Sequence, residues 1–146
     1  MEINMGDRTY AAVTINRHYY DQNKSVIDEM GYELADKSEE TVTFADDQSN
    51  YGNMDDIENF CQEHNIEYDK RWQAGDNYEA GEEHARIVKG ILNVHTMSDS
   101  GFIVLQELKT ILAETDPIKR EALLKKKVKE HEPFEVTPLK GPNSIH

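Results

Sequence analysis

The sequence contains a single cysteine, Cys61, and no long hydrophobic run. One thiol cannot form an intramolecular disulfide, which excludes a disulfide-stapled secreted domain and indicates a reducing compartment. No apolar stretch approaches the roughly 20 residues that a membrane-spanning helix needs. The first ten residues, MEINMGDRTY, lack the basic start and the apolar segment of a signal peptide. We therefore expect a cytoplasmic protein that makes no contact with a membrane.

The familiar signatures of catalysis are also missing. The chain has no glycine-rich phosphate-binding loop and no nucleophile elbow. Its six histidines form no ligand pattern, and the triplet Glu82-Glu83-His84 lacks the second histidine of a helical zinc site. Glu82 and Glu83 are the pair that we would assign to acid–base chemistry. We expect a protein that is not an enzyme and has no catalytic residue, metal ligand or cofactor.

Basic residues are scarce in the first part of the chain. Residues 1–83 hold 21 acidic and 6 basic side chains, a net charge of −15, whereas residues 84–146 hold 8 acidic and 10 basic ones, a net charge of +2. The segment 38–69 contains ten carboxylates and neither lysine nor arginine. Such a surface repels phosphate, which argues against direct binding of nucleic acid, and it attracts and steers basic proteins.

The pattern of apolar residues predicts alternating strands and helices. We expect strands over residues 8–20, 40–45, 66–72 and 84–97, the last of them either continuous or broken at Gly90. We expect helices over residues 24–36, 54–64, 102–115 and 117–130. Gly31 lies inside the first helix or ends it, with 32–35 then extended. Asn53 is predicted to cap the second helix, and Asp116, followed by Pro117, the last one.

These elements predict a single α/β or α+β domain over residues 1–132 and an extended C-terminal tail over residues 133–146. The expected order is β-α-β-α-β-β followed by two C-terminal helices, with a mixed sheet of about four strands. The strands at 40–45 and 66–72 would form a right-handed parallel unit through the helix between them. The apolar stripe of that helix is Met54, Ile57, Phe60, Cys61 and His64.

Carboxylates held on ordered elements without interspersed lysines can occupy a basic groove as phosphates would. We therefore predict a small acidic interaction protein that binds and inhibits or regulates a basic nucleic-acid-binding protein, by analogy with the anti-restriction and anti-CRISPR inhibitors of phages and mobile elements. The other interpretation is a face that only keeps the protein soluble. The predicted partner-binding residues are Asp46, Asp47, Asp55, Asp56, Glu58, Glu63, Glu67, Asp69, Asp76, Glu79, Glu82 and Glu83.

Two further hypotheses stay open at this point. The first is a module that binds a small molecule or a metal, with the loops 46–53 and 73–84 as the rim of its pocket. The second is self-association, because the helix over 102–112 is more apolar than a singly packed helix needs and so predicts a homodimer contact. The lysine cluster over 125–129 would complement the acidic part of a second copy.

Overall fold

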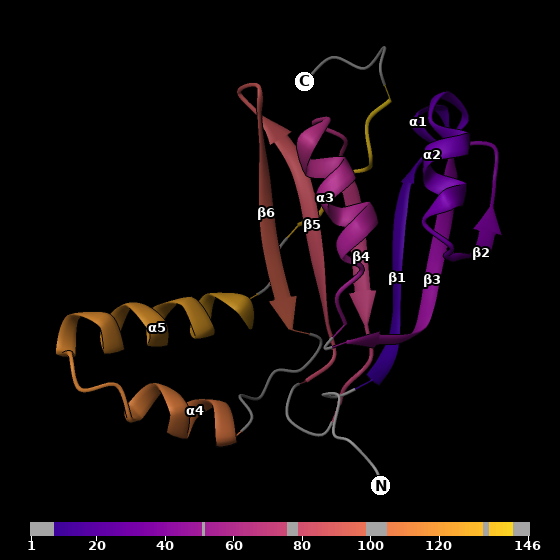
Figure 1. Ribbon diagram of the computed structural model, residues 1–146. Coiled ribbons are helices and arrows are strands. Elements are labelled where there is room, and N and C mark those ends of the chain that lie inside the picture. Colours follow the sequence, from indigo (N-terminus) through magenta and orange to yellow (C-terminus); the bar gives the residue numbers. More distant parts are fainter. Residues whose placement is uncertain (1–7, 51, 76–78, 99–104, 133–134, 142–146) are drawn as a thin grey trace, which may run out of the picture.

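The computed structural model describes residues 8–50, 52–75, 79–98, 105–132 and 135–141. Over these residues the chain forms six strands and five helices (Figure 1). The strands are β1 (Arg8–Asn16), β2 (Glu33–Lys37), β3 (Thr41–Asn50), β4 (Tyr68–Trp72), β5 (Gly81–Val88) and β6 (Ile91–Ser98). The helices are α1 (Arg17–Gln22), α2 (Lys24–Glu29), α3 (Asp55–Glu63), α4 (Leu105–Leu112) and α5 (Pro117–Glu130). None of these five helices is long and apolar enough to cross a bilayer.

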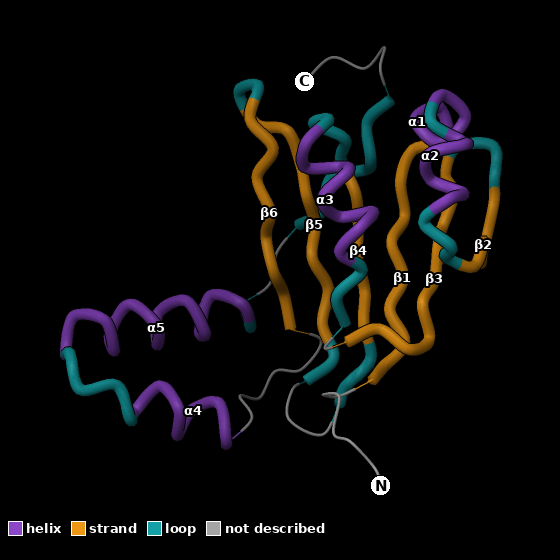
Figure 2. Tube along the Cα trace, viewed as in Figure 1, coloured by secondary structure: helices purple, strands orange, loops and turns teal. Residues whose placement is uncertain are grey.

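The six strands belong to one antiparallel sheet in the order β2-β3-β1-β4-β5-β6 (Figure 2). The α+β alternative is therefore confirmed, and the prediction of a mixed sheet of about four strands is wrong. β3 and β4 do run in the same direction, but β1 lies between them and is antiparallel to both. Periodicity along the chain cannot reveal this insertion, because it depends on pairing between segments that are far apart in sequence.

β1 ends at Asn16, before the predicted strand end at Tyr20. The side chain of Asn16 accepts a hydrogen bond from the backbone N–H of His18 at 2.9 Å and so caps α1. Tyr20 consequently lies on a helix, where its ring packs on that of Phe44 with the centroids 5.3 Å apart. Its hydroxyl donates to Asp28 at 2.8 Å. The local cap and this packing outweigh the strand propensity of the tyrosine.

Gly31 separates α2 from β2. Its φ of +84° is a left-handed conformation that glycine adopts without strain, and the helix stops at Glu29. The predicted helix over 24–36 is therefore wrong, and the alternative with an extended segment after Gly31 is confirmed. The predicted loop over 46–53 is wrong for residues 46–50, which belong to β3. Pairing with β1 outweighs the turn-forming composition of that segment.

The segment predicted as a strand over 84–97 is a hairpin of β5 and β6, with Lys89 and Gly90 as its turn. The interpretation with a break at Gly90 is confirmed. β5 begins at Gly81, so Glu82 and Glu83 lie in a strand and not in the loop predicted there.

The hydrophobic core packs α1, α2 and α3 against the central strands of the sheet. α3 begins after Met54, so the predicted cap by Asn53 is wrong, and Met54 provides no capping side chain. The predicted apolar stripe of α3 is buried except at His64, which is exposed. The buried core residues are Ala11, Val13, Ile15, Tyr20, Ile27, Val42, Phe44, Met54, Ile57, Phe60, Cys61, Ile66, Tyr68 and Ala85.

Residues 135–141 run as extended chain along the sheet face that carries Arg86. Successive residues of a strand point to opposite faces, so this face is opposite the buried Ala85. The Arg86 guanidinium donates to the carbonyl oxygen of Thr137 at 2.7 and 2.9 Å. The backbone N–H of Lys140 donates to the carboxylate of Glu67 at 2.8 Å. This segment is therefore fastened to the domain at two points.

α4 and α5 form a helical hairpin, here called the arm, that projects beyond β6 and away from the sheet (Figure 1). The Asp116 side chain accepts from the backbone N–H of Ile118 at 2.9 Å, with Pro117 in the first helical position, as predicted. α4 ends at Leu112, short of the predicted end at residue 115, and residues 102–104 lie outside the described part of the chain. The exposed large apolar residues of the arm are Leu105, Leu112, Ile118, Leu123, Leu124 and Val128.

Candidate functional site

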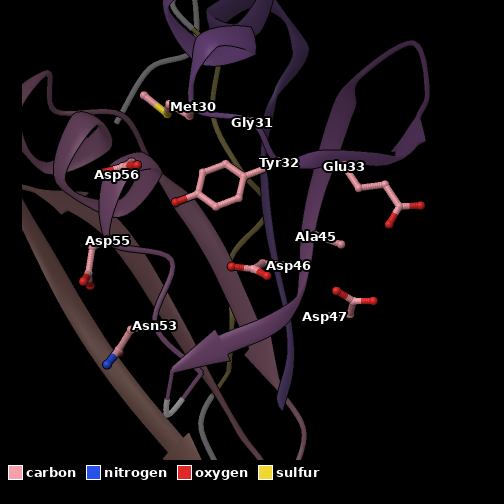
Figure 3. A pocket seen from close by; sticks show the side chains of 10 residues that line it. All are labelled: Met30, Gly31, Tyr32, Glu33, Ala45, Asp46, Asp47, Asn53, Asp55 and Asp56. Atoms are coloured by element: carbon pink, nitrogen blue, oxygen red, sulfur yellow. The ribbon is translucent and has the colours of Figure 1, made fainter. Parts of the chain in front are cut away.

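An open hollow of about 490 Å³ lies where the β2–β3 hairpin meets the start of α3 (Figure 3). Its lining residues are Met30, Gly31, Tyr32, Glu33, Ala45, Asp46, Asp47, Asn53, Asp55 and Asp56. Four of the predicted partner-binding residues, all aspartates, are thus brought together from β3 and α3. The hollow has a fifth carboxylate, Glu33, which was not among the predicted residues. Its position was assigned to a helix, and no pattern in the sequence distinguished the polar residues of that helix as site residues.

Tyr32, the residue directly before β2, crosses this hollow with its hydroxyl directed toward the start of α3 (Figure 3). Burial raises the pKa of Tyr32, and the charges of Asp56 and Asp46 add to that effect, while backbone hydrogen bonds with Ile57 and Asp56 act against it. A tyrosine hydroxyl at the first turn of α3 helps a helix whose N-cap, Met54, offers no side-chain acceptor. Tyr32 was not among the predicted site residues. Its position directly after Gly31, where a helix can end, is the feature of the sequence that could have indicated it.

The hollow gathers five carboxylates, those of Glu33 and of the four aspartates. Among the described residues, none of them lies within 4.0 Å of a lysine, arginine or histidine nitrogen. Asp46 is half-buried and accepts from the backbone N–H of Gln48 at 2.9 Å, and the other four are exposed. Asp55 and Asp56 also lie in the first turn of α3, where the helix dipole favours negative charge.

A shallow groove of about 430 Å³ between α2 and α3 continues from the hollow. It shares Met30 and Asp56 with the hollow and adds Glu29 and the predicted residue Glu63, both exposed. The two concavities together present one continuous acidic surface. We call it the acidic face and define it by Glu29, Glu33, Asp46, Asp47, Asp55, Asp56 and Glu63.

Glu58, Glu67 and Glu83 hold the fold together and are not displayed outward as predicted. Glu58 is 8% exposed and Glu67 3% exposed. Glu58 and Glu83 both pair with the buried Lys70, at 2.9 and 3.6 Å. Burial raises the pKa of Glu83, and Lys70 opposes that rise. Glu67 accepts the backbone N–H groups of Ile87 and of residue 140, each at 2.8 Å.

Asp69 and Glu82 flank the imidazole of His84. Its Nδ1 lies 2.5 Å from Asp69, and its Nε2 lies 2.8 Å from Glu82. Burial lowers the pKa of His84, but the two carboxylates outweigh burial, so the pKa is raised. Asp69 also pairs with Arg86 at 2.7 Å, and Glu82 with Arg71 at 3.0 Å. These two predicted residues thus have cationic partners within the sheet.

Glu79 anchors the arm to the sheet. Its carboxylate lies 2.9 Å from Nε2 of His131, directly after α5, and accepts from the hydroxyl of Ser98 at 2.8 Å. Burial lowers the pKa of His131, but hydrogen bonds to the Lys127 carbonyl and to Glu79 give a net rise. The remaining predicted residue, Asp76, lies outside the described residues.

The loops proposed as a pocket rim, 46–53 and 73–84, are joined by Trp72. A Cβ on Gly52 or on Gly81 would come within 2.8 or 2.7 Å of its side chain, so the indole fits between the two glycines. The indole N–H donates to the Glu79 carbonyl at 3.0 Å. In the described part of the chain, no group of three or more His, Cys, Asp or Glu residues could hold a metal ion.

Cys61 is buried in the core on α3. Burial, with a smaller contribution from the charge of Glu58, raises the pKa of the Cys61 thiol to about 12. A thiolate is the nucleophilic form of cysteine, so this side chain is unsuited to catalysis at neutral pH.

No protein-family model, curated protein or solved structure matches the chain. Its function is therefore inferred from its own surface, on which the acidic face gathers seven carboxylates that form no ion pair among the described residues.

Proposed function

We propose that this protein is a small acidic interaction protein whose acidic face binds a basic, nucleic-acid-binding protein and blocks or regulates it. One observation carries the proposal. The carboxylates of the acidic hollow have no basic partner among the described residues, whereas Glu58, Asp69, Glu79, Glu82 and Glu83 do have one. Unneutralised charge on one surface is what a cationic partner would recognise.

Rigidity of the acidic face supports the same proposal. Its carboxylates lie on the paired strands β2 and β3 and on α2 and α3, which pack on the core. Charges held in place by the fold lose little conformational freedom on binding, so more of the interaction energy appears as affinity. The long-range field of a chain with net charge −13 also speeds the encounter with a basic surface. A nucleic acid itself would be repelled.

We place this activity in the cytoplasm, because a single buried thiol suits a reducing compartment. The partner would carry a groove rich in lysine and arginine, and the acidic face would occupy it in place of phosphates.

A charge-reversal experiment tests the proposal. The variant Asp46→Lys, Asp47→Lys, Asp55→Lys, Asp56→Lys reverses the charge of the four aspartates that line the hollow. The matched control Glu39→Lys, Glu40→Lys, Glu132→Lys, Glu135→Lys makes the same change in net charge at exposed positions elsewhere. Tagged wild type, variant and control are used to capture proteins from host lysate at low and high salt, and captured proteins are identified by mass spectrometry.

We expect wild type and control to capture the same basic nucleic-acid-binding protein at low salt, with capture falling steeply as salt is added. The purified partner should lose its nucleic-acid binding when wild type is added, and the hollow variant should neither capture nor inhibit it. Equal capture by the hollow variant would show that the acidic face is not the binding surface. Capture without any effect on nucleic-acid binding would overturn the inhibitory role.

A further inference from the structure

The arm exposes most of its apolar side chains to solvent. α5 has 14 residues, and none of them is buried. Within α4 only Ile111 is buried. Short helices gain most of their stability by packing an apolar face against another surface, and exposed apolar patches commonly mark such a surface. The arm therefore has the character of a binding element.

The exposed apolar residues form a stripe along each helix of the arm. Leu105, Leu108 and Leu112 follow one another at spacings of three and four residues on α4, and Leu124 and Val128 are four residues apart on α5. Residues at these spacings lie on one side of a helix. Leu105 is 63% exposed, Leu112 58% and Val128 44%. We call these five residues the arm stripe.

The two halves of the arm stripe lie on the same side of the hairpin. The ammonium group of Lys127 lies 3.3 Å from the carboxylate of Glu107, so these two residues mark the sides on which α5 and α4 face each other. Val128 and Leu108 each follow one of them, roughly 100° further round their helices. In two antiparallel helices this same rotation leads to the same side of the pair.

Lysines flank the arm stripe on α5. Lys125 directly follows Leu124, and Lys129 directly follows Val128. Both lysines are exposed, and Lys129 forms no ion pair with a described residue. Lys125 lies 3.2 Å from Glu121, but a pair this exposed contributes little and leaves the lysine available. The arm thus presents apolar side chains bordered by positive charge.

The groove between α2 and α3 has the complementary composition. Its volume is about 430 Å³, and the described residues that line it include no lysine, arginine or histidine. Val26, which is 49% exposed, forms the apolar floor of the groove together with Met30 and Phe60. Its exposed carboxylates are those of Glu29, Asp56 and Glu63. A groove of this kind suits an amphipathic helix with apolar and basic residues.

We propose that the arm of one copy binds the α2–α3 groove of a second copy, and that the two copies exchange arms reciprocally to form a dimer. The arm stripe would cover the apolar floor of the partner's groove. Lys125 and Lys129 would lie beside the groove carboxylates of the partner subunit. Each dimer would contain this contact twice, which helps it to reach the roughly 1,200–2,000 Å² that a stable interface buries.

The distribution of charge and the shape of the chain favour a second copy as the occupant. Residues 1–83 have a net charge of −15 and residues 84–146 a net charge of +2, so exchanged arms bring the basic part of each chain to the acidic part of the other. The arm projects beyond β6 and away from α2, so it does not lie on the groove of its own chain (Figure 1).

Pairing would also regulate the acidic face, a consequence that rests on the proposed function. The groove contributes Glu29 and Glu63 to that face, so a bound arm would compete with a basic partner protein. Sedimentation of the purified chain decides whether the copies pair, and it needs no partner protein. Capture from lysate decides the proposed function separately, so failure of one does not imply failure of the other.

Sedimentation equilibrium with charge reversal tests the pairing. Wild type should sediment with twice the mass of the 16.8 kDa chain. The arm variant Lys125→Glu, Lys129→Glu and the groove variant Glu29→Lys, Glu63→Lys each bring like charges together and should be monomeric. Both should keep the circular dichroism spectrum of wild type, because all four positions are exposed.

Two matched controls make the same changes in charge at other exposed positions. Lys119→Glu, Lys126→Glu alters α5 on the side away from the arm stripe, because these residues are close to half a turn from Leu124 and Val128. Glu39→Lys, Glu40→Lys alters residues that do not line the groove. Both controls should remain dimeric.

An equimolar mixture of the arm variant and the groove variant gives the sharpest result. The acidic arm of the first then meets the basic groove of the second, and the other arm and groove keep their natural charges. The mixture should therefore sediment as a dimer although each variant alone is a monomer. A wild type that stays monomeric at the highest concentration reached overturns the proposal. So does a dimeric groove variant, which would place the arm elsewhere, or a mixture that stays monomeric.

Discussion

Nζ of Lys70 on β4 lies 2.9 Å from Oε1 of Glu58 on α3, and both side chains are buried. The second oxygen of Glu58 accepts the backbone N–H of Met54 at 2.6 Å. One carboxylate therefore caps the start of α3 and joins this helix to the sheet. Lys70 also lies over the Trp72 ring, 5.1 Å from its centroid, and 3.6 Å from Glu83. The pair thus fixes the helix that carries part of the acidic face.

Removing the cation should destabilise the protein strongly. Lys70→Met leaves the buried Glu58 and the half-buried Glu83 without their countercharge, and breaking a buried ion pair costs about 3–5 kcal/mol. Urea denaturation followed by circular dichroism measures the free energy of unfolding. The control is Arg71→Met at the next residue, whose side chain is 71% exposed and pairs with Glu82, and it should cost no more than about 1 kcal/mol. Equal losses in the two variants would contradict the role of Lys70.

Gly52 should tolerate no side chain. Its φ is +76°, and a Cβ would lie 2.8 Å from Cβ and Cγ of Trp72. The matched control is Gly31, with φ +84° and no atom within 4 Å of the same added Cβ. Gly31→Ala should cost about 1–2 kcal/mol for the left-handed backbone alone. Gly52→Ala should cost a further 1–3 kcal/mol or so from overpacking. Chemical denaturation of both variants checks the difference, and similar losses would show that the indole simply moves aside.

The stability contributed by His84 should depend on pH in a definite direction. Its pKa is raised above the ordinary 6.5 by Asp69 and Glu82 against the effect of burial. The protonated ring is therefore favoured in the folded state. Its contribution should be fully present below about pH 6.5 and be lost as pH rises through the higher folded pKa.

Unfolding measurements from pH 5.5 to 9, values chosen to span roughly the ordinary pKa of histidine, test this expectation. The stability difference between wild type and His84→Gln should shrink as pH rises. His18→Gln, at an exposed position, serves as the control variant. A difference that stays constant over this range would rule out a protonated His84 in the fold.

The segment 135–141 should contribute to stability although it has no helix or strand. A chain ending at residue 134 loses the donor from residue 140 to Glu67 and the Thr137 acceptor of Arg86. Hydrogen bonds to charged groups contribute about 1.5–3 kcal/mol each, so the loss of these two contacts should cost roughly 3–6 kcal/mol. A chain ending at residue 141 keeps both contacts and should unfold like wild type. Thermal and urea denaturation of the two truncations provide the comparison.

Local patterns in the sequence identified those features of the fold that depend on neighbouring residues. The start of α5 at Asp116 and Pro117 was predicted, and so was the buried stripe of α3 apart from His64, because a cap and a helical period are encoded within a few residues. The sheet order was not predicted, because inserting β1 between β3 and β4 depends on distant pairings. Asn16 is a local example of a feature that the sequence pattern did not predict. Its side chain caps α1, so the expected end of the strand is a helix.

The sequence predicted that the candidate site is acidic, but it did not predict which carboxylates belong to the site. The aspartates at 46, 47, 55 and 56 do gather at one hollow. Glu67 does not belong with them, because its donors are backbone groups at residues 87 and 140, which no local pattern connects to it. Glu58 likewise meets its cation only because β4 places Lys70 under α3. Whether a carboxylate has a partner is therefore decided by residues that are distant in sequence and that the fold brings next to it.

The burial of Cys61 makes this residue a reporter of motion in the core. With its thiol pKa near 12 and its side chain enclosed, the residue can react with a thiol reagent only when the core around α3 opens. It is the sole cysteine, so the labelling signal comes from one known position. The rate of labelling at neutral pH therefore measures how often this part of the molecule opens, without any engineered probe.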